Sequence, residues 1–161
     1  MVVKMILCTD SIGNIGKDND LLFHIKKDMQ FFKQSTTNSI VIMGYNTWLS
    51  LGEKELPNRI NIVLTDKEIN NVITDTSLER KIEQIKKVTS KDIYIIGGAY
   101  VYNYALANDL VDEVLITIVP TVVKDADTRV DMELMKDFNK KEILETFEYK
   151  EMNVTIEKWQ K

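Results

Sequence analysis

One carboxylate, Asp28, has surroundings that suit an acid with a chemical task. It falls in a segment, residues 25–35, in which Ile25, Met29 and Phe32 lie around it at the spacing of one helix face. A carboxylate on an apolar face is costly unless it has a partner. In a cleft, such an acid could hold a protonated or amidine-like ring, and desolvation would raise its pKa. The pattern alone fits a capping or solvated acid near a helix start equally well.

Two junctions between an apolar run and a helical segment carry glycine. Gly97-Gly98 stands at one of them and Gly44 at the other. A helix N-terminus favours an anion, and glycine lets the backbone approach a phosphate closely. Because open α/β sheets bind ligands at the carboxyl ends of their strands, two such junctions on one sheet indicate a phosphate-bearing ligand more strongly than either alone. Neither junction completes the dinucleotide fingerprint, and a double glycine can also serve a tight turn only.

Other kinds of chemistry lack the residues that they need. His24 is the only histidine and Cys8 the only cysteine, and no spacing of ligands supports a metal site. No serine or cysteine stands in a nucleophile motif, so covalent catalysis is not expected. Cys8 lies in an apolar run, where core packing is the expected role, and it has no partner for a disulfide. We therefore expect no metal. The start of the chain has no signal-peptide pattern, so we expect a reducing, cytoplasmic setting.

Composition places the chain among globular proteins of one domain. It has 161 residues, of which 44% are hydrophobic and 29% charged, and a formal net charge of −4. This length allows one core and is too short for two ordinary domains. The charge and the lack of a basic cluster argue against nucleic-acid binding, and no apolar run is long enough to cross a membrane. With mixed surface charge and no obvious apolar stripe, a monomer is expected.

Periodicity predicts the elements that must hold Asp28 and the glycines in place. Continuous apolar runs predict buried strands, and stripes at helical spacing predict amphipathic helices. Strands are expected at residues 2–8, 40–43, 60–64, 93–96 and 111–119, an antiparallel hairpin at 142–149 and 153–159, and helices at 25–35, 46–51, 77–88 and 99–107. Residues 10–20, rich in glycine, asparagine and aspartate, are expected to form a long mobile surface loop. The fold class is thus α/β: a single domain, residues 1–161, with a mixed, mainly parallel twisted sheet of about eight strands, about four flanking helices and an antiparallel C-terminal hairpin.

Four short motifs occur in order along the chain. Residues 15–23 resemble the motif I-G-x-x-N-x-L-P-W, and Asp28 follows five residues later. Residues 41–50 resemble V-I-M-G-R-x-T-W-x-S, residues 56–65 resemble L-P-x-R-x-N-x-V-L-T/S, and residues 95–102 contain the glycine pair. In this order and spacing, the motifs make the chain similar to the dihydrofolate reductase family over nearly its whole length.

The resemblance implies an oxidoreductase that reduces 7,8-dihydrofolate to 5,6,7,8-tetrahydrofolate for one-carbon and thymidylate metabolism, and an antifolate target. A hydride would pass from NADPH to C6 of the pterin while N5 gains a proton. Asp28 would hold the pterin 2-amino group and N3 side and would promote protonation of N5 through water, with Thr117 supporting it and Phe23 beside it. This implied role agrees with the choice of Asp28 from its surroundings alone.

The resemblance also implies two sets of binding residues. Arg59 would clasp the α-carboxylate of the glutamate tail, since its planar fork allows bidentate recognition. Apolar residues would line the pterin and its benzoyl tail: Ile6, Leu7, Cys8, Leu21, Phe23, Met29, Phe32, Leu51 and Ile96. The cofactor would be bound by Cys8, Ile15, Gly16, Asn19, Leu21, Gly44, Tyr45, Asn46, Thr47, Leu64, Thr65, Asp66, Ile96, Gly97, Gly98, Ala99, Tyr100, Val101, Tyr102 and Thr128. The segment 13–22 would close over the nicotinamide as a lid.

Three positions depart from the family pattern at the cofactor. Tyr45 stands where many members carry an arginine near the 2′-phosphate, Asp66 where a serine is common, and Tyr100 where a basic or polar residue is frequent. An acid and two tyrosines bind a phosphate poorly, although Thr65 and Lys67 remain to contact it. We therefore expect NADPH as the cofactor, together with tolerance of NADH.

Three other functions fit part of the pattern. A reductase of the same fold that acts on a pyrimidine intermediate of flavin synthesis would lack the pairing of Asp28 with Arg59. A nucleotide-binding module without catalysis would need only Gly97-Gly98 and leaves the acid on the apolar helix unexplained. An interaction domain would use aromatic residues such as Phe31 and Trp48 as core only.

Overall fold

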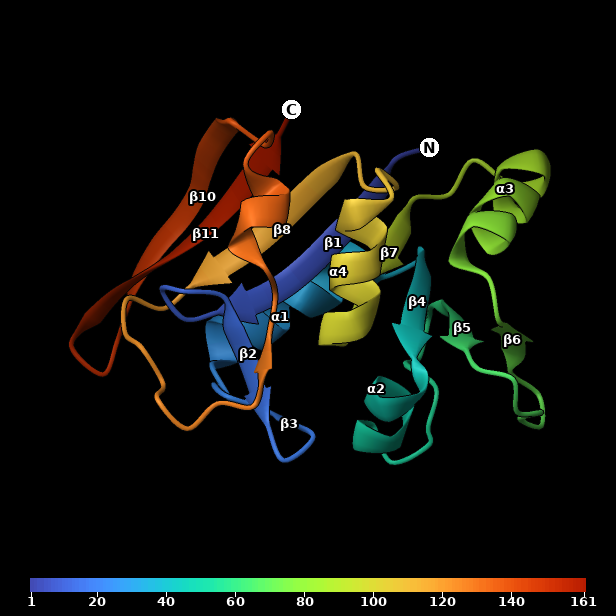
Figure 1. The fold of residues 1–161 in the computed structure, drawn as a ribbon, viewed down its shortest axis with the longest axis horizontal. Helices are drawn as coiled ribbons and strands as arrows, with labels where there is room; N and C mark the ends of the chain where they lie inside the picture. The colour runs from blue at the N-terminus through green and yellow to red at the C-terminus, as the bar shows by residue number, and fades with distance from the viewer.

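A twisted sheet of eight strands forms the centre of the computed structural model, which describes residues 1–161 (Figure 1). The strand order is β10-β11-β8-β1-β7-β4-β5-β6. The six strands from β8 to β6 run parallel, and β11 and β10 extend the sheet antiparallel at one edge. The strands are β1 (Val3–Thr9), β4 (Ile40–Gly44), β5 (Ile60–Leu64), β6 (Ile73–Asp75), β7 (Ile93–Ile95), β8 (Glu113–Ile118), β10 (Lys140–Tyr149) and β11 (Met152–Gln160). The expected mixed α/β class and the antiparallel C-terminal hairpin are confirmed.

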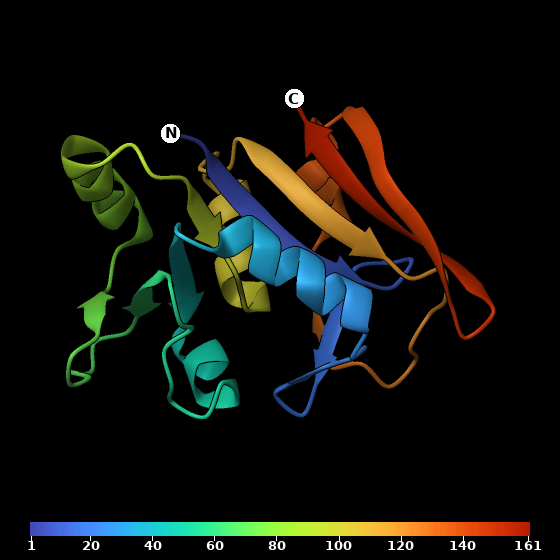
Figure 2. The ribbon, with the colours of Figure 1, turned by 180° about the vertical axis from the view of Figure 1, so that it is seen from behind.

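Helices cover both faces of this sheet. One face carries α1 (Lys26–Thr36), which is in front in Figure 2, and the other carries α4 (Ala99–Ala107), which is in front in Figure 1. Side chains of α3 (Leu78–Val88) share a core with α4, whereas those of α2 (Tyr45–Ser50) share one with α1. All four helices were expected, with ends that differ by one residue at most.

The central strands β4 and β7 carry no charged residue, because helices cover both faces of the sheet there. Every residue of β7 is buried, as are the first four of β4. This is why continuous apolar runs, rather than alternating ones, predicted these strands. Along the antiparallel edge, β11 mixes buried and half-buried positions, whereas β10 is exposed over most of its length.

The segment 10–20 differs from its prediction as a long surface loop. Three short strands form a second antiparallel sheet here: β2 (Asn14–Lys17), β3 (Asp20–Leu21) and β9 (Thr128–Arg129). Gly13 has a φ of +94°, and a Cβ there would lie 2.4 Å from the carbonyl oxygen of Val130. A Cβ at Gly16 would lie 2.7 Å from Oγ1 of Thr128. The prediction was wrong because these glycines, which also signal turns, instead allow close packing against the β9 segment.

Other differences are short elements and element ends. The sequence did not predict β6, β9 or the 3-10 helix η1 (Met132–Met135), which are too short to show a period. The start of β8 lies two residues later than expected, because the Asp112 side chain accepts a hydrogen bond from the Val3 N–H at 2.9 Å. The expected cap of α3 is present, since Ser77 Oγ accepts from the Arg80 N–H at 3.2 Å. None of the helices has the length and apolarity to span a membrane.

Candidate functional site

Asp28 lies in the first turn of α1, and its carboxylate meets the sheet. Its Oδ1 accepts a hydrogen bond from Oγ1 of Thr117 on β8 at 2.6 Å. Cys8 on β1 is the register partner of Thr117, so the thiol and the hydroxyl lie on neighbouring strands beneath the carboxylate. Thr117 is almost fully buried. The structure therefore brings together three of the predicted site residues from two strands and a helix.

Burial sets the proton affinity of this group. Desolvation raises the pKa of the Asp28 carboxyl above its ordinary value of 3.8, and hydrogen bonds from Thr117 and Cys8 act in the opposite direction. Burial and then the charge of Asp28 raise the pKa of the Cys8 thiol, which therefore stays protonated and acts as a donor. The phenol of Tyr102 also has a raised pKa, through burial and then the charge of Asp28. Asp28 therefore holds a proton up to a higher pH than a free aspartate does, as its surroundings in the sequence predicted.

Two apolar clusters adjoin the helix that carries the half-buried Asp28. Phe23 and Phe31 pack, with Cys8, on the cluster that contains Ile25. Further residues expected at the pterin belong to the neighbouring cluster between α1, α2 and the sheet: Ile6, Phe32, Leu51 and Ile96. The sequence missed Phe31, which packs on both clusters, and placed Met29 on the apolar face instead. Because a helix face is broad, the spacing alone did not distinguish these two side chains.

Two expected pterin residues leave apolar surface open. Met29 is 52% exposed and Leu21 is 53% exposed, although both have large apolar side chains. Met29 follows the half-buried Asp28 in α1, and exposed apolar surface beside an acid is what a flat aromatic ligand can cover. Thus these residues are placed at the rim of the site and not in its floor.

Leu7 requires a correction. Successive side chains of a strand point to opposite faces of the sheet, so Leu7 faces away from Ile6 and Cys8. Its side chain packs in the core beneath α3 and α4. The Leu7 side chain therefore does not belong to the apolar clusters beside α1, although the family resemblance implied Leu7 at the pterin.

Arg59 is held at the C-terminal end of α1. Its Nη1 donates to Oγ1 of Thr36 at 3.0 Å and its Nε donates to the Pro57 carbonyl oxygen at 2.9 Å. The guanidinium carbon lies 5.9 Å from the ring centroid of Phe32. Burial lowers the pKa of Arg59 below its usual value, but a guanidinium remains charged at neutral pH. The N–H groups that these contacts leave free can bind a carboxylate beside the aromatic ring.

The glycine junctions meet at one edge of the sheet. The Gly44 N–H donates to the Gly97 carbonyl oxygen at 2.8 Å, which joins the ends of β4 and β7. Gly97 has a φ of +119°, and a Cβ there would lie 3.3 Å from the Tyr102 ring and 3.4 Å from Thr47 Oγ1. The Gly97–Gly98 peptide bond is cis. Only glycine fits here without strain, and this bare backbone at the start of α4 suits a dinucleotide that carries phosphates.

Hydrogen bonds join the small sheet of β2, β3 and β9 to the 125–127 segment and to α2. The Asp18 N–H donates to Oδ2 of Asp127 at 2.8 Å, and the Asp127 N–H donates to the Gly16 carbonyl oxygen at 3.0 Å. Asn19 Nδ2 reaches the Asn46 carbonyl oxygen of α2 at 3.1 Å. The β2–β3 hairpin therefore spans from the 125–127 segment to α2. The sequence assigns no role to the Asp127 side chain, because no local pattern marks an acid whose partners lie far away in the chain.

The other residues expected at the cofactor lie at the ends of β4, β5 and β7, in the first turn of α4 or on the small sheet. Half-buried or buried side chains among them are Ile15, Leu64, Thr65, Ala99 and Val101, and exposed ones are Asp66, Tyr100 and Thr128. Tyr100 is 81% exposed and stacks on Tyr104 at 6.2 Å between ring centroids. No group of three or more possible metal-ligating side chains comes together anywhere in the chain.

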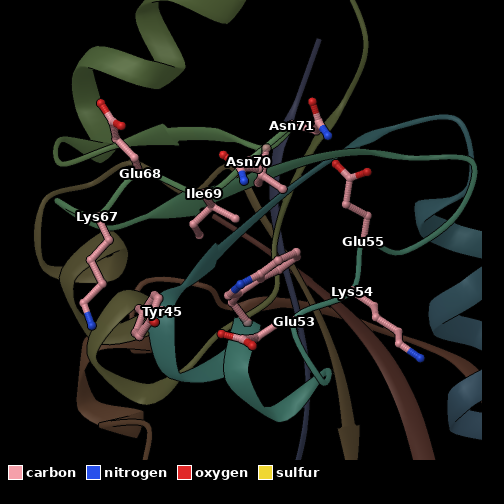
Figure 3. A pocket seen from close by; sticks show the side chains of 11 residues that line it. Tyr45, Glu53, Lys54, Glu55, Lys67, Glu68, Ile69, Asn70 and Asn71 are labelled. Atoms are coloured by element: carbon pink, nitrogen blue, oxygen red, sulfur yellow. The ribbon is translucent and has the colours of Figure 1, made fainter.

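A cavity of about 610 Å³ adjoins the start of α2 (Figure 3). Tyr45 and Trp48 of α2 line it together with the segments 53–55 and 67–72. At one end, Lys67 Nζ lies 4.4 Å from the ring centroid of Tyr45, and the Lys67 N–H donates to Thr65 Oγ1 at 3.1 Å. Asp28 does not line the cavity. Lys67, at this end of it, is a cation next to Thr65, where the cofactor is expected.

With this geometry established, comparison with known proteins decides the family. The model of a protein family described as dihydrofolate reductase matches residues 2–161 of this chain. The chain belongs to the dihydrofolate reductase family. Dihydrofolate reductases are oxidoreductases, and Asp28, Gly44 and Gly97-Gly98 of this chain lie at the positions of the family motifs. The family resemblance that the motifs indicated is therefore confirmed.

Relatives and a solved structure agree with this family. The dihydrofolate reductase of Haemophilus influenzae is 34% identical over 130 residues, which cover 80% of this chain and 78% of that protein. The bifunctional dihydrofolate reductase-thymidylate synthase of Paramecium tetraurelia is 36% identical over 116 residues, 71% of this chain, which spans only 25% of that longer protein. The fold matches that of dihydrofolate reductase from Enterococcus faecalis, in complex with NADP(H) and RAB-propyl, with a TM-score of 0.80, 24% identity, and coverage of 99% of this chain and 95% of that one.

Proposed function

We propose that this chain reduces 7,8-dihydrofolate to 5,6,7,8-tetrahydrofolate with NADPH. The observation that carries the proposal is the half-buried Asp28 carboxylate, which accepts a hydrogen bond from Thr117 at 2.6 Å and lies on a helix that also contributes Phe31 and Phe32 to the apolar clusters. Family membership supports the same reaction. A metal-dependent or covalent route is not needed, because a positioned acid and a hydride donor suffice for this chemistry.

Asp28 acts on the pterin ring. Its carboxylate accepts hydrogen bonds from the 2-amino group and the N3 side, and Thr117 fixes the carboxylate by donating to Oδ1. A cyclic amidine edge offers two parallel donors, which match the two oxygens of one carboxylate. The charge of the ionised Asp28 carboxylate is partly desolvated, so it favours the protonated form of the bound ring and promotes protonation of N5 through water.

The rest of the chain aligns two rings and keeps bulk water out. When bound, the nicotinamide of NADPH supplies the hydride for C6 of the pterin. The glycine edge at Gly44 and Gly97-Gly98 leaves room for the dinucleotide backbone. Phe23, with Leu21 and Met29 at the rim, covers the pterin, and the β2–β3 hairpin acts as the lid. Correct placement of two reactants supplies much of the rate enhancement in such a reaction.

Arg59 and the apolar residues bind the remainder of the substrate. Phe32, Leu51 and Ile96 form the surface for the benzoyl ring, and Ile6 lies beneath them. The free N–H groups of Arg59 bind the α-carboxylate of the glutamate tail. We further propose that residues 1–161 act as one domain, as a monomer in the cytoplasm.

Reduction of dihydrofolate by the purified chain tests this proposal. We expect NADPH to be consumed in proportion to added dihydrofolate and the reaction to stop with stoichiometric methotrexate. Dinucleotide binding without dihydrofolate-dependent consumption would identify a nucleotide-binding module instead. Turnover that methotrexate does not inhibit, on a pyrimidine substrate of flavin synthesis, would identify the other reductase.

The cofactor preference is expected to be modest. Tyr45, Asp66 and Tyr100 bring no cation to the 2′-phosphate, so the remaining cation is Lys67 on the ring of Tyr45 (Figure 3). We propose that NADPH is preferred and NADH tolerated, with a ratio of kcat/KM values below about 100, which corresponds to about 2.7 kcal/mol.

Replacement of Lys67 by Met tests the source of this preference. An exposed ion pair contributes about 0.2–1 kcal/mol, so Lys67→Met is expected to lower the NADPH-to-NADH ratio of kcat/KM and of Kd by at most about fivefold. The matched control is Lys54→Met, because Lys54 lines the other end of the same cavity. A ratio far above 100 in the parent enzyme, or one that Lys67→Met leaves unchanged, would contradict this assignment.

A further inference from the structure

Asp10 is a buried carboxylate that the proposed reaction does not use. It follows β1, is 1% exposed and forms no salt bridge. A buried charge without a counter-charge is costly unless several donors satisfy it. The Asp10 side chain meets this condition with four N–H donors, and no cation is involved.

The two oxygens of Asp10 have different partners. Oδ1 accepts from the N–H groups of Ile12 and Asn14, both at 3.0 Å, and so closes a local turn. Oδ2 accepts from Asn14 Nδ2 at 2.8 Å and from the distant Val123 N–H at 2.9 Å. Asn14 Nδ2 also lies 3.3 Å from the Val123 carbonyl oxygen, to which it donates. The side chains of Asp10 and Asn14 therefore hold both backbone polar groups of Val123, as a neighbouring strand would.

These contacts of Asp10 and Asn14 with Val123, here called the clamp, join the start of the β2–β3 hairpin to the 121–127 segment. Asn14 begins β2, and the Ser11 N–H adds a bond to the Thr121 carbonyl oxygen at 2.9 Å. A few residues beyond Val123, Asp125 forms an ion pair with Lys17 of β2, and Asp127 binds the lid backbone as described above. Asp125 and Asp127, which hold the β2–β3 hairpin, therefore belong to the same segment as Val123, which Asp10 binds.

We propose that Asp10 is a positioning residue for the reaction: through Val123 it fixes the 121–127 segment against the root of the lid and so keeps the β2–β3 hairpin closed over the bound rings. The inference rests on the proposed function for its effect on hydride transfer. An ionised carboxylate suits this position because it only accepts hydrogen bonds, whereas an amide would present a donor to one pair of N–H groups. Desolvation opposes ionisation, but the hydrogen bonds from Val123, Asn14 and Ile12 prevail and hold the pKa of Asp10 below its usual value.

Asp10→Asn tests the clamp with little change in shape. The amide can keep its oxygen toward Ile12 and Asn14, but its NH₂ group then faces the Val123 N–H. Hydrogen exchange of the ligand-free protein is expected to become about 10- to 100-fold faster in the segments 14–21 and 121–127 only, as for the loss of a hydrogen bond to a charged group. Single-turnover hydride transfer is expected to slow by a similar factor, with kcat lowered, and with the KM for dihydrofolate and the Kd of methotrexate within twofold of the parent values.

Two further variants separate the clamp from general stability. Asn14→Ala removes only the bridging amide, so it is expected to speed exchange in the same segments by a smaller factor and to keep the protein folded if Asp10→Asn does not fold. Ser77→Ala removes the cap of α3, far from the lid in Figure 1. It is expected to lower the Tm and to leave exchange in the lid and single-turnover hydride transfer unchanged.

The outcomes distinguish this inference from the proposed function. If exchange rises evenly over the whole chain, or if hydride transfer in both clamp variants equals that of the parent, Asp10 has no positioning role. A parent chain that does not reduce dihydrofolate overturns the proposed function, and with it the effect on hydride transfer, whatever the exchange shows. If the parent reduces dihydrofolate and the clamp variants show faster hydrogen exchange only in 14–21 and 121–127 together with slower hydride transfer, both the inference and the proposed function are supported.

Discussion

Asp28→Asn is expected to lower the rate of hydride transfer at neutral pH by about 10²–10⁴-fold, the usual range for loss of acid assistance. An amide at this position cannot promote protonation of N5, although Thr117 can still donate to its oxygen. The loss is expected to shrink as the pH falls, because dihydrofolate protonated in solution then reaches the variant directly. The measurement is single-turnover hydride transfer over a range of pH values, with binding of NADPH unchanged.

The control for this variant is a second change of an acid to an amide. Asp109 is exposed at the end of α4 and contacts Lys161, away from the glycine edge. Asp109→Asn is expected to show the parent rate at every pH. If Asp28→Asn also kept the parent rate at every pH, Asp28 would have no part in the chemistry.

Arg59→Lys is expected to raise the KM for dihydrofolate by about 10- to 100-fold with little change in kcat. Hydrogen bonds to charged groups contribute about 1.5–3 kcal/mol, and a lysine cannot reproduce the planar fork of the guanidinium. The existing contacts of Arg59 with Thr36 and Pro57 already hold that fork in place, so little ordering is needed when a carboxylate binds. The measurement is the dependence of the initial rate on dihydrofolate concentration.

A truncated substrate is the control for Arg59. Dihydropteroate lacks the glutamate tail and therefore its α-carboxylate, so parent and Arg59→Lys are expected to have equal kcat/KM for it. An equal loss on both substrates would mean that Arg59 supports the fold of the 57–61 segment and does not recognise the carboxylate.

The residues that periodicity could identify lie in regular elements. Asp28 interrupts an apolar stripe at helical spacing, and this local signal requires no knowledge of the fold. The glycine junctions were visible for the same reason, since each stands between a buried strand and a helix. Expected and observed helices agree because caps and amphipathic spacing act within a few residues of one another.

The parts that the sequence did not reveal depend on distant contacts. The Val123 N–H lies 113 positions from Asp10, and the Asp18 N–H lies 109 positions from Asp127. Within residues 10–20, aspartate, asparagine and glycine are typical both of a surface loop and of a segment tied down by side chains. Only the position of residues 128–132 distinguishes a loop from a tied segment, because these residues fill the space beside Gly13 and Gly16.

The most direct test of the central claim is the titration of the Asp28 carboxyl itself. Carbon-13 NMR of the labelled protein, with the Asp28 signal assigned by its absence in Asp28→Asn, measures the pKa of this one group. Since desolvation outweighs the hydrogen bonds from Thr117 and Cys8, the carboxyl is expected to titrate above 3.8. A pKa at or below that value would show that desolvation does not dominate at this carboxyl, and the proposed mechanism would be contradicted.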